Sequence, residues 1–522
     1  MASTTAKTTH KAPKGTRDSY PEDLLRRRYI TESWRAVSIR HGFEEIDGPT
    51  FEHSDLYAVK SGEGILGELF QAFSGKSPEE VEQVQRDGRA PYALRPEFTP
   101  TLARMYAARA SSLGGITRWF CVQPFFRAER PQRGRLREFY QWNCDVLGGT
   151  GGDSSSPSHL DVECLYLLVQ NLEQLGIGTD SSRVGFDFRV SAENTLVGNF
   201  GIAPERVDAA LDVVDRLAKQ SDEQLAPAVA KLIDQDPLTW LARLRADRQT
   251  PPVPFSEQKP VLLNNAPPEW GMEHFVSAVE AFQIDDWMWR DFSVVRGLAY
   301  YTGTVFEVIA EGERAVAGGG RYDNLIELFG GPPTPAVGFG MGDVVLTNLL
   351  DDRGLMPEGP ELKSAIDQIV CTTSLRPEAF VVAAGDEDAA GLVTPLLATL
   401  RRGLERDGFQ AELADGTAKP WDPTRYDPAR GGVRPLHART TDKATTNPKK
   451  LLQDANRHHA RFYIQIDGGL DNADGKVALK DLDAKRDLTP NDIGIADKAQ
   501  FSVRPEDPHS VGRAIVHLLD RV

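Results

Sequence analysis

The chain has 522 residues, which is enough for two or three domains that each bury a hydrophobic core. Its net charge of −16 argues against a protein that coats nucleic acid non-specifically, and no apolar run approaches the roughly 18 residues of a membrane span. Residues 1–14 are polar and lack the apolar core of a signal peptide, so they are predicted to form a disordered arm. The four cysteines include no Cys-x-x-Cys pair, which indicates neither zinc nor a disulfide framework and fits a cytoplasmic protein.

Residues 21–49 predict a helix followed by a short strand. Pro21 suits the first helical position, and Gly42 ends the helix before a strand over 43–46. The apolar residues of the helix follow a helical spacing: Leu25, Ile30, Trp34 and Val37. Taken alone, this pattern is that of an ordinary core helix.

Thr99 and Pro100 predict a second helix start, with Thr99 as the N-cap and Pro100 at the first helical position. Glu97 lies just before this terminus. A carboxylate there can simply interact with the helix dipole, so the pattern by itself assigns it no function.

Residues 119–147 predict two strands joined by a basic turn. The turn contains Glu129 among five arginines: Arg127, Arg130, Arg133, Arg135 and Arg137. Because side chains alternate along a strand, Gln141, Asn143 and Asp145 share one face of the return strand and its apolar residues share the other. A polar face beside an arginine-rich turn suits an anionic, hydrogen-bonding substrate such as a nucleotide with an amino acid. The alternative is a solvated hairpin with Arg–Glu ion pairs.

The middle of the chain is less informative. Ser158 is predicted to cap a helix that ends at Gly176, and alternation over 184–190 predicts a strand. A helical pattern follows around 207–214, whereas residues 220–259 allow no assignment. Beyond a strand at 304–309, the triple glycine 318–320 is predicted to turn the chain, with close backbone approach or positive φ. Residues 336–346 predict a strand that leads into a helix.

After a proline-containing linker over 351–378, strands alternate with helices to the C-terminus, which predicts an α/β domain. Phe409 is predicted to begin one of the strands, and residues 511–518 a final helix. The domain is interrupted by a long loop, 415–447, which is locally basic through Arg425, Arg430, Arg434, Arg439 and Lys443. RNA contact and simple solvation remain equal alternatives for this loop.

Five stretches together resemble the histidyl-tRNA synthetases, which are class II aminoacyl-tRNA synthetases. The hairpin resembles their motif 2, residues 21–49 their motif 1 and residues 336–346 their motif 3. The peptide RGLAYY resembles the one that distinguishes the histidine enzymes within the class. In chain order, the stretches are KGTRDSYP (14–21), LRPEFTP (94–100), the hairpin (125–149), RGLAYYTGTVFEV (296–308) and GGGRYDNL (318–325).

The resemblance implies an α+β fold. It predicts a class II catalytic core with an antiparallel sheet over residues 15–350, interrupted by a helical insertion at about 150–290. The linker 351–378 would then lead to an anticodon-binding α/β domain over 379–522, with the inserted loop 415–447. Because motif 1 forms the dimer interface in class II synthetases, a homodimer is expected.

The implied activity is that of a histidine–tRNA ligase, which joins histidine to ATP as histidyl-adenylate and transfers histidine to tRNA(His). In this family arginines stabilise the reacting phosphate, so Arg127 and Arg296 are the expected catalytic residues. Glu129 and Arg135 are expected to contact ATP with Arg127. The residues expected to bind histidine are Glu97, Thr99, Arg127, Gln141, Asp145, Arg296, Tyr300, Tyr301 and Tyr322.

One position departs from the family pattern. Motif 3 usually ends with an arginine that stacks on adenine, but GFGMGDVVL places Val345 there. This departure favours an alternative function, a non-catalytic histidine-sensing regulatory subunit of ATP phosphoribosyltransferase. Arg127, Arg296 and the C-terminal α/β domain favour the enzyme. Mg²⁺ is expected with ATP, but the sequence identifies no ligands for it.

Overall fold

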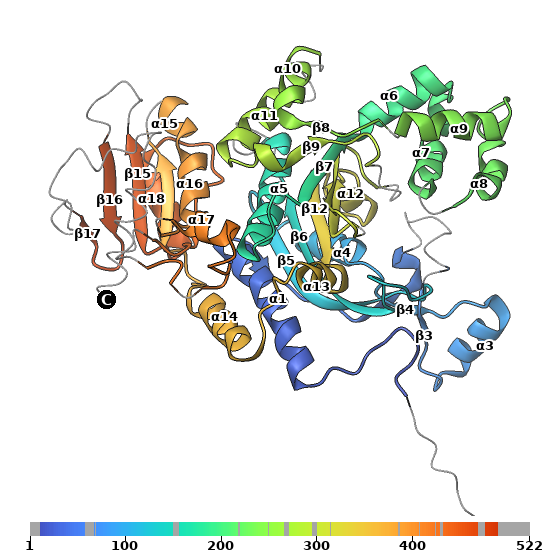
Figure 1. Cartoon of the computed structure of the whole chain (residues 1–522), viewed down its shortest axis with the longest axis horizontal. Helices are drawn as coiled ribbons and strands as arrows, with labels where there is room; N and C mark the ends of the chain where they lie inside the picture. The colour runs from blue at the N-terminus through green and yellow to red at the C-terminus, as the bar shows by residue number, and fades with distance from the viewer. Residues whose placement is uncertain are drawn as a thin grey trace, which may run out of the picture.

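The computed structural model has three parts: a centre built on a large sheet, a helical part at one end and an α/β part at the other (Figure 1). No described helix is both long and apolar enough to cross a membrane. The predicted final helix, the first ten residues of the predicted arm, Arg430 and Arg296 lie outside the described residues. The described residues are 11–57, 67, 69–149, 156–217, 220–248, 250–265, 271–294, 300–313, 315–384, 387–406, 408–422, 424–427, 432–467 and 476–488.

The central sheet has nine strands, and its pairing is antiparallel except at β1–β5 and β7–β9. The predicted α+β class with an antiparallel catalytic sheet is therefore confirmed. In spatial order the strands are β1 (Glu44–Glu45), β5 (Thr117–Phe126), β6 (Glu138–Leu147), β12 (Ala336–Gly342), β11 (Ala317–Arg321), β10 (Thr304–Ala310), β7 (Ser182–Phe188), β9 (Met288–Arg290) and β8 (Val253–Pro254).

Strand β6 divides its side chains between the two faces of the sheet as its alternation predicts. On one face, which we call the back face, Trp142 stacks on Trp34 with 6.1 Å between ring centroids and contributes to the main hydrophobic core. Gln141, Asn143 and Asp145 point to the opposite, front face. The helices of this central part are α1 (Pro21–Arg40), α4 (Thr99–Arg109), α5 (Pro157–Gln174), α12 (Leu325–Leu328) and α13 (Asp343–Asp352).

Helices α1 and α5 cover the back face, and α4 and α12 contribute to the smaller core on the front face. Helix α5 begins earlier than predicted, because Ser156 and not Ser158 caps it by accepting a hydrogen bond from the backbone of His159. Likewise, Thr99 is the first residue of α4 and not its N-cap. A small sheet of β2 (Phe51–His53), β4 (Tyr92–Leu94) and β3 (Gln71–Ala72) lies with α3 (Pro78–Asp87) beyond the central sheet.

The prediction of a turn at the triple glycine was wrong. Gly318, Gly319 and Gly320 form the middle of β11, and none has a positive φ. The other expectation, close backbone approach, is met: a Cβ on Gly319 would lie 2.1 Å from the carbonyl oxygen of Gly338. The glycines therefore let β11 pack between β10 and β12 where side chains would clash.

The helical part has a hydrophobic core of its own, which includes Leu196, Leu225 and Trp240. Strand β7 ends at Phe188, so Val190 of the predicted strand belongs to α6. The helices are α6 (Arg189–Phe200), α7 (Val207–Arg216), α8 (Asp222–Val229) and α9 (Pro237–Arg248), with α10 (Phe255–Asn265) and α11 (Met272–Ala281) leading back to the sheet. These helices lie within the range 150–290, where the sequence predicts a helical insertion, whereas α5 and β7 of the same range belong to the central part.

The C-terminal part is an α/β unit with a five-stranded sheet, in the order β14-β13-β15-β16-β17. The predicted strand at Phe409 was wrong, because Phe409–Ala414 forms helix α17. Within the expected linker, α14 (Gly359–Cys371) packs against α1 and buries Leu362, Ala365 and Ile366. The remaining elements are β13 (Ala379–Ala383), α15 (Glu387–Gly391), α16 (Val393–Arg402), β14 (Ala438–Arg439), α18 (Pro448–Arg457), β15 (Phe462–Asp467), β16 (Lys476–Asp481) and β17 (Arg486–Asp487).

The basic residues of segment 415–447 are mostly occupied within the protein. Arg425 pairs with Glu405, Arg434 with Glu378 and Lys443 with Asp454. Arg439 packs over Gly42, where a Cβ would lie 3.0 Å from its Nε. These four side chains are therefore neither purely solvated nor simply displayed for RNA; they hold the segment to the rest of the chain.

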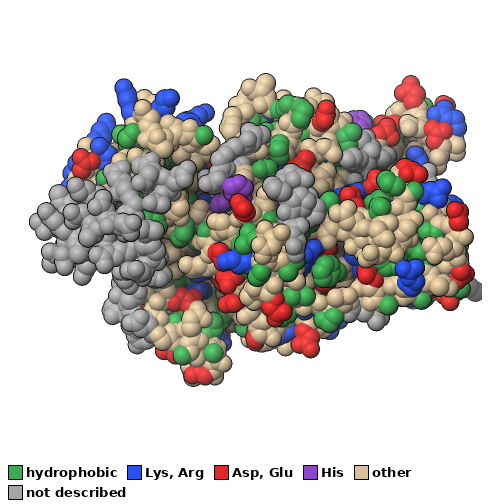
Figure 2. Space-filling view, turned by 90° about the horizontal axis from the view of Figure 1, so that it is seen from above, with side chains coloured by type: hydrophobic (Ala, Val, Ile, Leu, Met, Phe, Trp, Pro, Cys, Tyr) green, Lys and Arg blue, Asp and Glu red, His purple; other side chains and the backbone are tan. Residues whose placement is uncertain are grey.

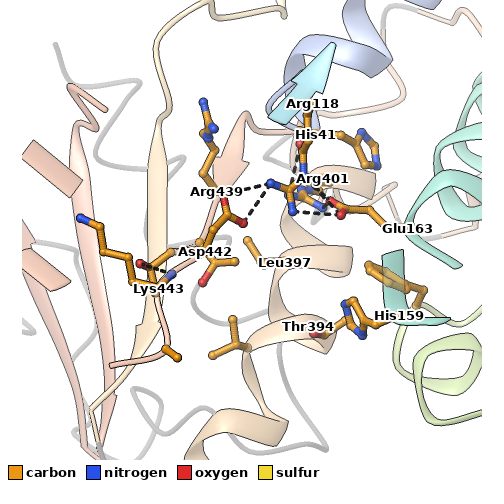
Figure 3. Close-up of a pocket in the computed structure, with 15 residues that line it drawn as sticks. His41, Arg118, His159, Glu163, Thr394, Leu397, Arg401, Arg439, Asp442 and Lys443 are labelled. Carbon is orange, nitrogen blue, oxygen red and sulfur yellow. Dashed lines mark hydrogen bonds and ion pairs between the residues drawn. The ribbon is translucent and has the colours of Figure 1, made fainter. Parts of the chain in front are cut away.

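An arginine cluster joins the C-terminal part to the central part. Arg118 on β5 forms ion pairs of 3.0 Å with both Glu163 on α5 and Asp442 of segment 415–447 (Figure 3). Arg401 on α16 donates to the carbonyl oxygen of Ala438 at 3.0 Å and lies beside the same Glu163, as Figure 3 also shows. The cluster lines a cavity of about 100 Å³ between the two parts. Loss of one partner from such a cluster would leave a buried charge without compensation, so these ion pairs depend on one another.

Seen from above, Lys and Arg side chains gather along one edge of the C-terminal part (Figure 2). At the helical end of the same view, positive and negative side chains are mixed. The negative net charge of the chain is therefore unevenly distributed over this face.

We predict that Gly319→Ala lowers the free energy of unfolding by about 1–3 kcal/mol, because the added methyl group overpacks β11 against β12. The atoms it would meet are the carbonyl oxygen of Gly338 at 2.1 Å and the Cβ of Phe339 at 2.7 Å. Thermal melting followed by circular dichroism measures the effect. Gly198→Ala in α6, where nothing lies within 4 Å, is the control and should leave Tm equal or higher. Equal melting of wild type and Gly319→Ala would contradict the close packing.

Candidate active site

Apart from Ala336 at the start of β12, the front face of β11 and β12 consists of five glycines, which we call the glycine floor: Gly318, Gly320, Gly338, Gly340 and Gly342. It lies beside the polar face of β6, where Gly338 is paired with Asp145 and Gly340 with Asn143. A Cβ on Gly338 would lie 2.0 Å from Oδ1 of Asp145, and one on Gly340 would lie 2.5 Å from Nε2 of Gln141. The absence of side chains on the floor therefore makes room for the polar groups of β6.

Asp145 is the buried centre of this face, with 2% of its surface exposed. The Tyr322 hydroxyl donates a hydrogen bond to its Oδ1 at 2.5 Å, whereas Oδ2 is buried without a hydrogen-bond partner among the described residues. Burial raises the pKa of Asp145 to about 7, although the Tyr322 hydrogen bond lowers it. Such a carboxyl group is prepared to accept a proton or a hydrogen bond from a ligand. Among the residues that the structure describes, it pairs with a tyrosine and not with an arginine.

Two further tyrosines stand beside this pair. The ring of Tyr300 lies 4.9 Å from that of Tyr301 and 5.9 Å from that of Tyr322. The Tyr300 hydroxyl donates to Oε2 of Glu97 at 3.1 Å, and burial followed by the Glu97 charge raises its pKa well above the ordinary value. Tyr301 packs against the floor, since a Cβ on Gly320 would lie 2.8 Å from its ring.

Glu97 itself is 6% exposed and lies two residues before Thr99, the first residue of α4. The structure thus joins the predicted Glu97, Asp145, Tyr300, Tyr301 and Tyr322 in one cluster, and Thr99 lies at its edge through an interaction with Tyr300. Residues separated by more than 200 positions meet there because β6, β11 and α4 share the front face.

Arg127 lies at the end of β5, where its guanidinium carbon is 5.3 Å from the ring centroid of Phe139. Its Nε donates to the carbonyl oxygen of Pro96 at 3.0 Å, which ties it to the segment carrying Glu97. Its backbone N–H donates to the carbonyl oxygen of Arg137 at 2.9 Å and continues the hairpin pairing. The side chain is half-buried and presents a permanent positive charge near the cluster.

The basic turn of the hairpin is held by contacts of its own. Arg135 pairs with Glu129 at 2.5 Å, and Arg137 donates to the carbonyl oxygen of Glu129 at 3.1 Å. The segment before α1 lies against the turn, since the backbone N–H of Arg137 donates to the carbonyl oxygen of Gly15 at 2.7 Å. Part of the solvated-hairpin alternative is thus correct, because Arg135 and Glu129 do pair with each other.

Gln141 lies on the same face of β6 as Asp145, two residues before Asn143. Its Nε2 donates to Oδ1 of Asn143 at 2.9 Å, so the three polar side chains follow one another along the strand. Val345 is buried at 9% exposed in the core behind the sheet. An arginine side chain at position 345 would not fit in this apolar core. The valine that departs from the motif 3 pattern therefore matches the packing around it.

Sequence reasoning missed the glycine floor and two side chains. GGG at 318–320 and GFGMG at 338–342 place glycine at every second position, which is the signal that could have revealed a bare strand face. Asn143 was placed on the polar face without a role, and Glu307 was not considered. Glu307 is on β10 opposite Gly318, and therefore on the front face beside the floor.

Comparison with known proteins identifies the family. The family model described as histidyl-tRNA synthetase matches residues 15–342. A histidine–tRNA ligase of Opitutus terrae is 36% identical over 355 residues, which cover 66% of this chain and 75% of the relative. The histidine–tRNA ligase of Natronomonas pharaonis is 35% identical over 421 residues, covering 77% and 87%. The chloroplastic/mitochondrial enzyme of Arabidopsis thaliana is 32% identical, with 69% of each chain covered.

The chain belongs to the histidyl-tRNA synthetase family. The predicted membership, which rested on five short stretches, is therefore confirmed. The match with the family model begins at the first of those stretches and ends at Gly342, where β12 leads into α13. It thus includes the whole front-face cluster of this family member.

We predict that Asp145 makes the ligand-free protein less stable as pH rises from about 4 to about 7. Its folded pKa of about 7 exceeds the unfolded value of roughly 3.9, so the folded state holds the proton in this window and the unfolded state does not. Relative to Asp145→Asn, the wild-type free energy of unfolding should fall by up to about 1.4 kcal/mol per pH unit. Thermal melting of both proteins between pH 4 and pH 8 tests this, and a pH-independent difference in Tm would contradict it.

Proposed function

We propose that the protein is a histidine–tRNA ligase, which makes histidyl-adenylate from histidine and ATP and then transfers histidine to tRNA(His). The observation that carries this proposal is the buried Asp145 carboxyl group, bonded to Tyr322 and with Oδ2 left for a ligand. An imidazole has two polar nitrogens, of which one donates and the other accepts in the neutral form. A carboxylate and nearby tyrosine hydroxyls match both nitrogens.

In the first step, a carboxylate oxygen of histidine attacks the α-phosphorus of ATP, and the bond to the β-phosphate oxygen breaks to release pyrophosphate. Two anions must approach, so the site has to supply positive charge and alignment, not a nucleophile. Arg127 is the proposed source of charge at the α-phosphate, because it is half-buried, permanently charged and anchored at Pro96. Glu129 and Arg135 are proposed to contact ATP, which requires their mutual ion pair to open or to be shared.

The backbone end of histidine, opposite the imidazole, is assigned to Glu97, Thr99 and Gln141. Glu97 is a buried carboxylate already hydrogen-bonded to Tyr300, which suits the α-ammonium group of an amino acid. Gln141 and Asp145 are four residues apart on one strand, so they reach toward opposite ends of a bound amino acid and not to one atom.

The proposal includes Mg²⁺ with ATP, where it would offset phosphate charge. No group of three or more His, Cys, Asp and Glu side chains in the described part of the chain could hold a metal ion. Mg²⁺ is usually bound by one or two carboxylates together with substrate phosphates, so such a group is not required. Glu307 beside the glycine floor is the carboxylate that we assign to this role.

Three further assignments rest on the family. The C-terminal α/β domain, 379–522, is proposed to bind the anticodon, supported by the edge of Lys and Arg side chains on that part (Figure 2). A homodimer formed through motif 1 is supported by the exposed apolar side chain of Leu24 on α1. A cytoplasmic location is proposed from the cysteine pattern of the sequence. Sedimentation equilibrium would test the dimer.

The alternative, a histidine-sensing regulatory subunit, would bind histidine without activating it. Exchange of labelled pyrophosphate into ATP separates the two functions. The ligase predicts exchange that depends on histidine and on none of the other amino acids. Calorimetric binding of histidine without exchange would support the sensor. If the protein showed no histidine binding and no exchange, both functions would be overturned.

We predict that Asp145→Asn weakens histidine binding by on the order of 1.5–3 kcal/mol, because it removes the charge from a hydrogen-bond acceptor, and leaves ATP binding nearly unchanged. Calorimetric titration of each ligand measures this. The control is Asp187→Asn, which removes a second buried carboxylate, 1% exposed, from β7 of the same sheet but outside the proposed site. If Asp145→Asn lost equal affinity for histidine and ATP, or if the two variants weakened histidine binding equally, Asp145 would not belong to the histidine site.

We also predict that Arg296→Ala lowers the rate of histidine-dependent exchange by about 10²–10³-fold, the usual effect of losing one electrostatic contact to a reacting group. This assignment rests on the position of Arg296 in RGLAYY. Melting curves must match those of the wild type. A folded variant with normal exchange would remove Arg296 from the reaction.

A further inference from the structure

A buried arginine–carboxylate pair lies behind the tyrosines of the candidate site. Arg321 is the last residue of β11, between Gly320 and Tyr322. Because side chains alternate along a strand, Gly320 and Tyr322 face the front of the sheet and the Arg321 side chain points to the back face. There its NH2 lies 2.6 Å from Oδ1 of Asp161 on α5, and both side chains are at most 7% exposed.

The pair joins the two chain segments that carry the tyrosines. Oδ2 of Asp161 accepts a hydrogen bond from the Thr304 hydroxyl at 2.7 Å, three residues after Tyr301. NH2 of Arg321 also donates to the carbonyl oxygen of Pro157 at 2.6 Å, at the first turn of α5. One helix position thus holds the end of β11 and the start of β10 at the same time.

The connection continues directly to the residues next to the tyrosines. The backbone N–H of Thr302 donates to the carbonyl oxygen of Arg321 at 2.7 Å. The Thr302 hydroxyl donates to Oδ2 of Asp323 at 2.9 Å, and NH1 of Arg321 donates to Oδ1 of the same carboxylate at 2.9 Å. Tyr301 and Tyr322 are therefore each flanked by a member of this network.

The charges depend on each other. Burial raises the pKa of Asp161, and Arg321 partly offsets that effect. Burial lowers the pKa of Arg321, but Asp161 and Asp323 together raise it above the ordinary value. Losing either partner would leave a buried charge without compensation, and the surrounding segments would move to relieve it.

We propose that Asp161 and Arg321 are positioning residues for histidine selectivity: they set the separation of Tyr301 and Tyr322, and so the fit of the imidazole against Asp145. This inference rests on the proposed function of the front-face cluster. Neither residue touches the substrate, because both lie on the back face of the sheet. Their effect should therefore be on histidine binding, whereas the ATP contacts at Arg127 and the basic turn lie at the far end of β6 and should be unaffected.

A second buried pair on the same helix provides a matched control. Arg118 pairs with Glu163, two residues beyond Asp161 on α5, and its side chain is 11% exposed. Arg118 lies within β5, a ten-residue strand whose pairing with β6 runs from Thr117 to Phe126. That ladder keeps the neighbours of Arg118 in place when its side chain is lost. Arg321 ends its strand, and beyond it the backbone N–H of Tyr322 keeps a single bond to the neighbouring strand, to the carbonyl oxygen of Ala336 at 2.7 Å.

The test is steady-state pyrophosphate exchange with KM measured separately for histidine and ATP, together with calorimetric Kd for histidine. For Arg321→Met, we expect histidine KM and Kd to rise by about 10- to 100-fold, as displacements of about 1 Å in a binding site do, with ATP KM within about twofold. Arg321→Lys keeps the charge beside Asp161 but cannot reach three acceptors, so it should be intermediate. Arg118→Met should leave histidine KM within about twofold.

Thr304→Val keeps the test decisive if Arg321→Met fails to fold, because it removes only the hydroxyl that Asp161 binds. It should raise histidine KM by a few-fold while melting close to the wild type. Unchanged histidine KM and Kd in folded Arg321→Lys and Thr304→Val, an equal rise in ATP KM, or an equal effect of Arg118→Met would overturn the proposal. If the wild type binds histidine without exchange, the proposed enzyme function fails, and the Kd values alone decide the positioning role.

Discussion

The candidate site depends on two neighbouring strands whose front face is almost entirely glycine. Apart from Ala336 at the start of β12, every front position of β11 and β12 is glycine, so the polar face of β6 is not covered from that side. Because a Cβ on Gly338 would overlap the Asp145 carboxyl group, the glycines and the buried acid require each other. The raised pKa of Asp145 and its hydrogen bond from Tyr322 follow from this placement in the sheet.

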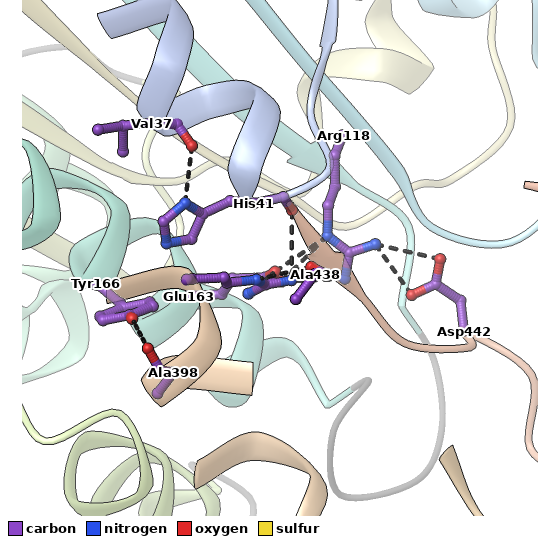
Figure 4. Close-up of polar contacts among 9 residues, drawn as sticks. Val37, His41, Arg118, Glu163, Tyr166, Ala398, Ala438 and Asp442 are labelled. Carbon is purple, nitrogen blue, oxygen red and sulfur yellow. Dashed lines mark hydrogen bonds and ion pairs between the residues drawn. The ribbon is translucent and has the colours of Figure 1, made fainter. Parts of the chain in front are cut away.

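The back face carries the charges that fix this arrangement. Helix α5 presents Asp161 to Arg321 and Glu163 to Arg118, so one helix secures both the glycine strands and the hairpin. Arg118 also pairs with Asp442, so the same arginine contacts both α5 and the C-terminal part (Figure 4). The candidate site and the C-terminal part are thus attached to opposite faces of one sheet.

Much of the site was predictable because its residues lie in short, characteristic stretches. Glu97, Arg127, Asp145, Tyr300, Tyr301 and Tyr322 were all named from the sequence, and the structure brings Glu97, Asp145 and the three tyrosines together. Two of the failed local predictions, the turn at 318–320 and the strand at Phe409, share one reason, which is that tertiary context overrode local preference. Glycines that favour a turn in isolation form a strand where two neighbours need a bare surface, and Phe409 begins a helix instead of a strand.

By itself, the sequence determined the family, the antiparallel class of the fold and the polar face of β6, because periodicity and short motifs are local properties of the chain. Only the tertiary structure decided which carboxylates keep an open oxygen, which arginines are used internally and which glycines form the floor. The sequence left RNA contact and solvation as equal alternatives for Arg425 and Arg434, whereas in the folded protein they pair with Glu405 and Glu378. Burial and pairing depend on contacts between distant segments, and no local pattern in the chain encodes them.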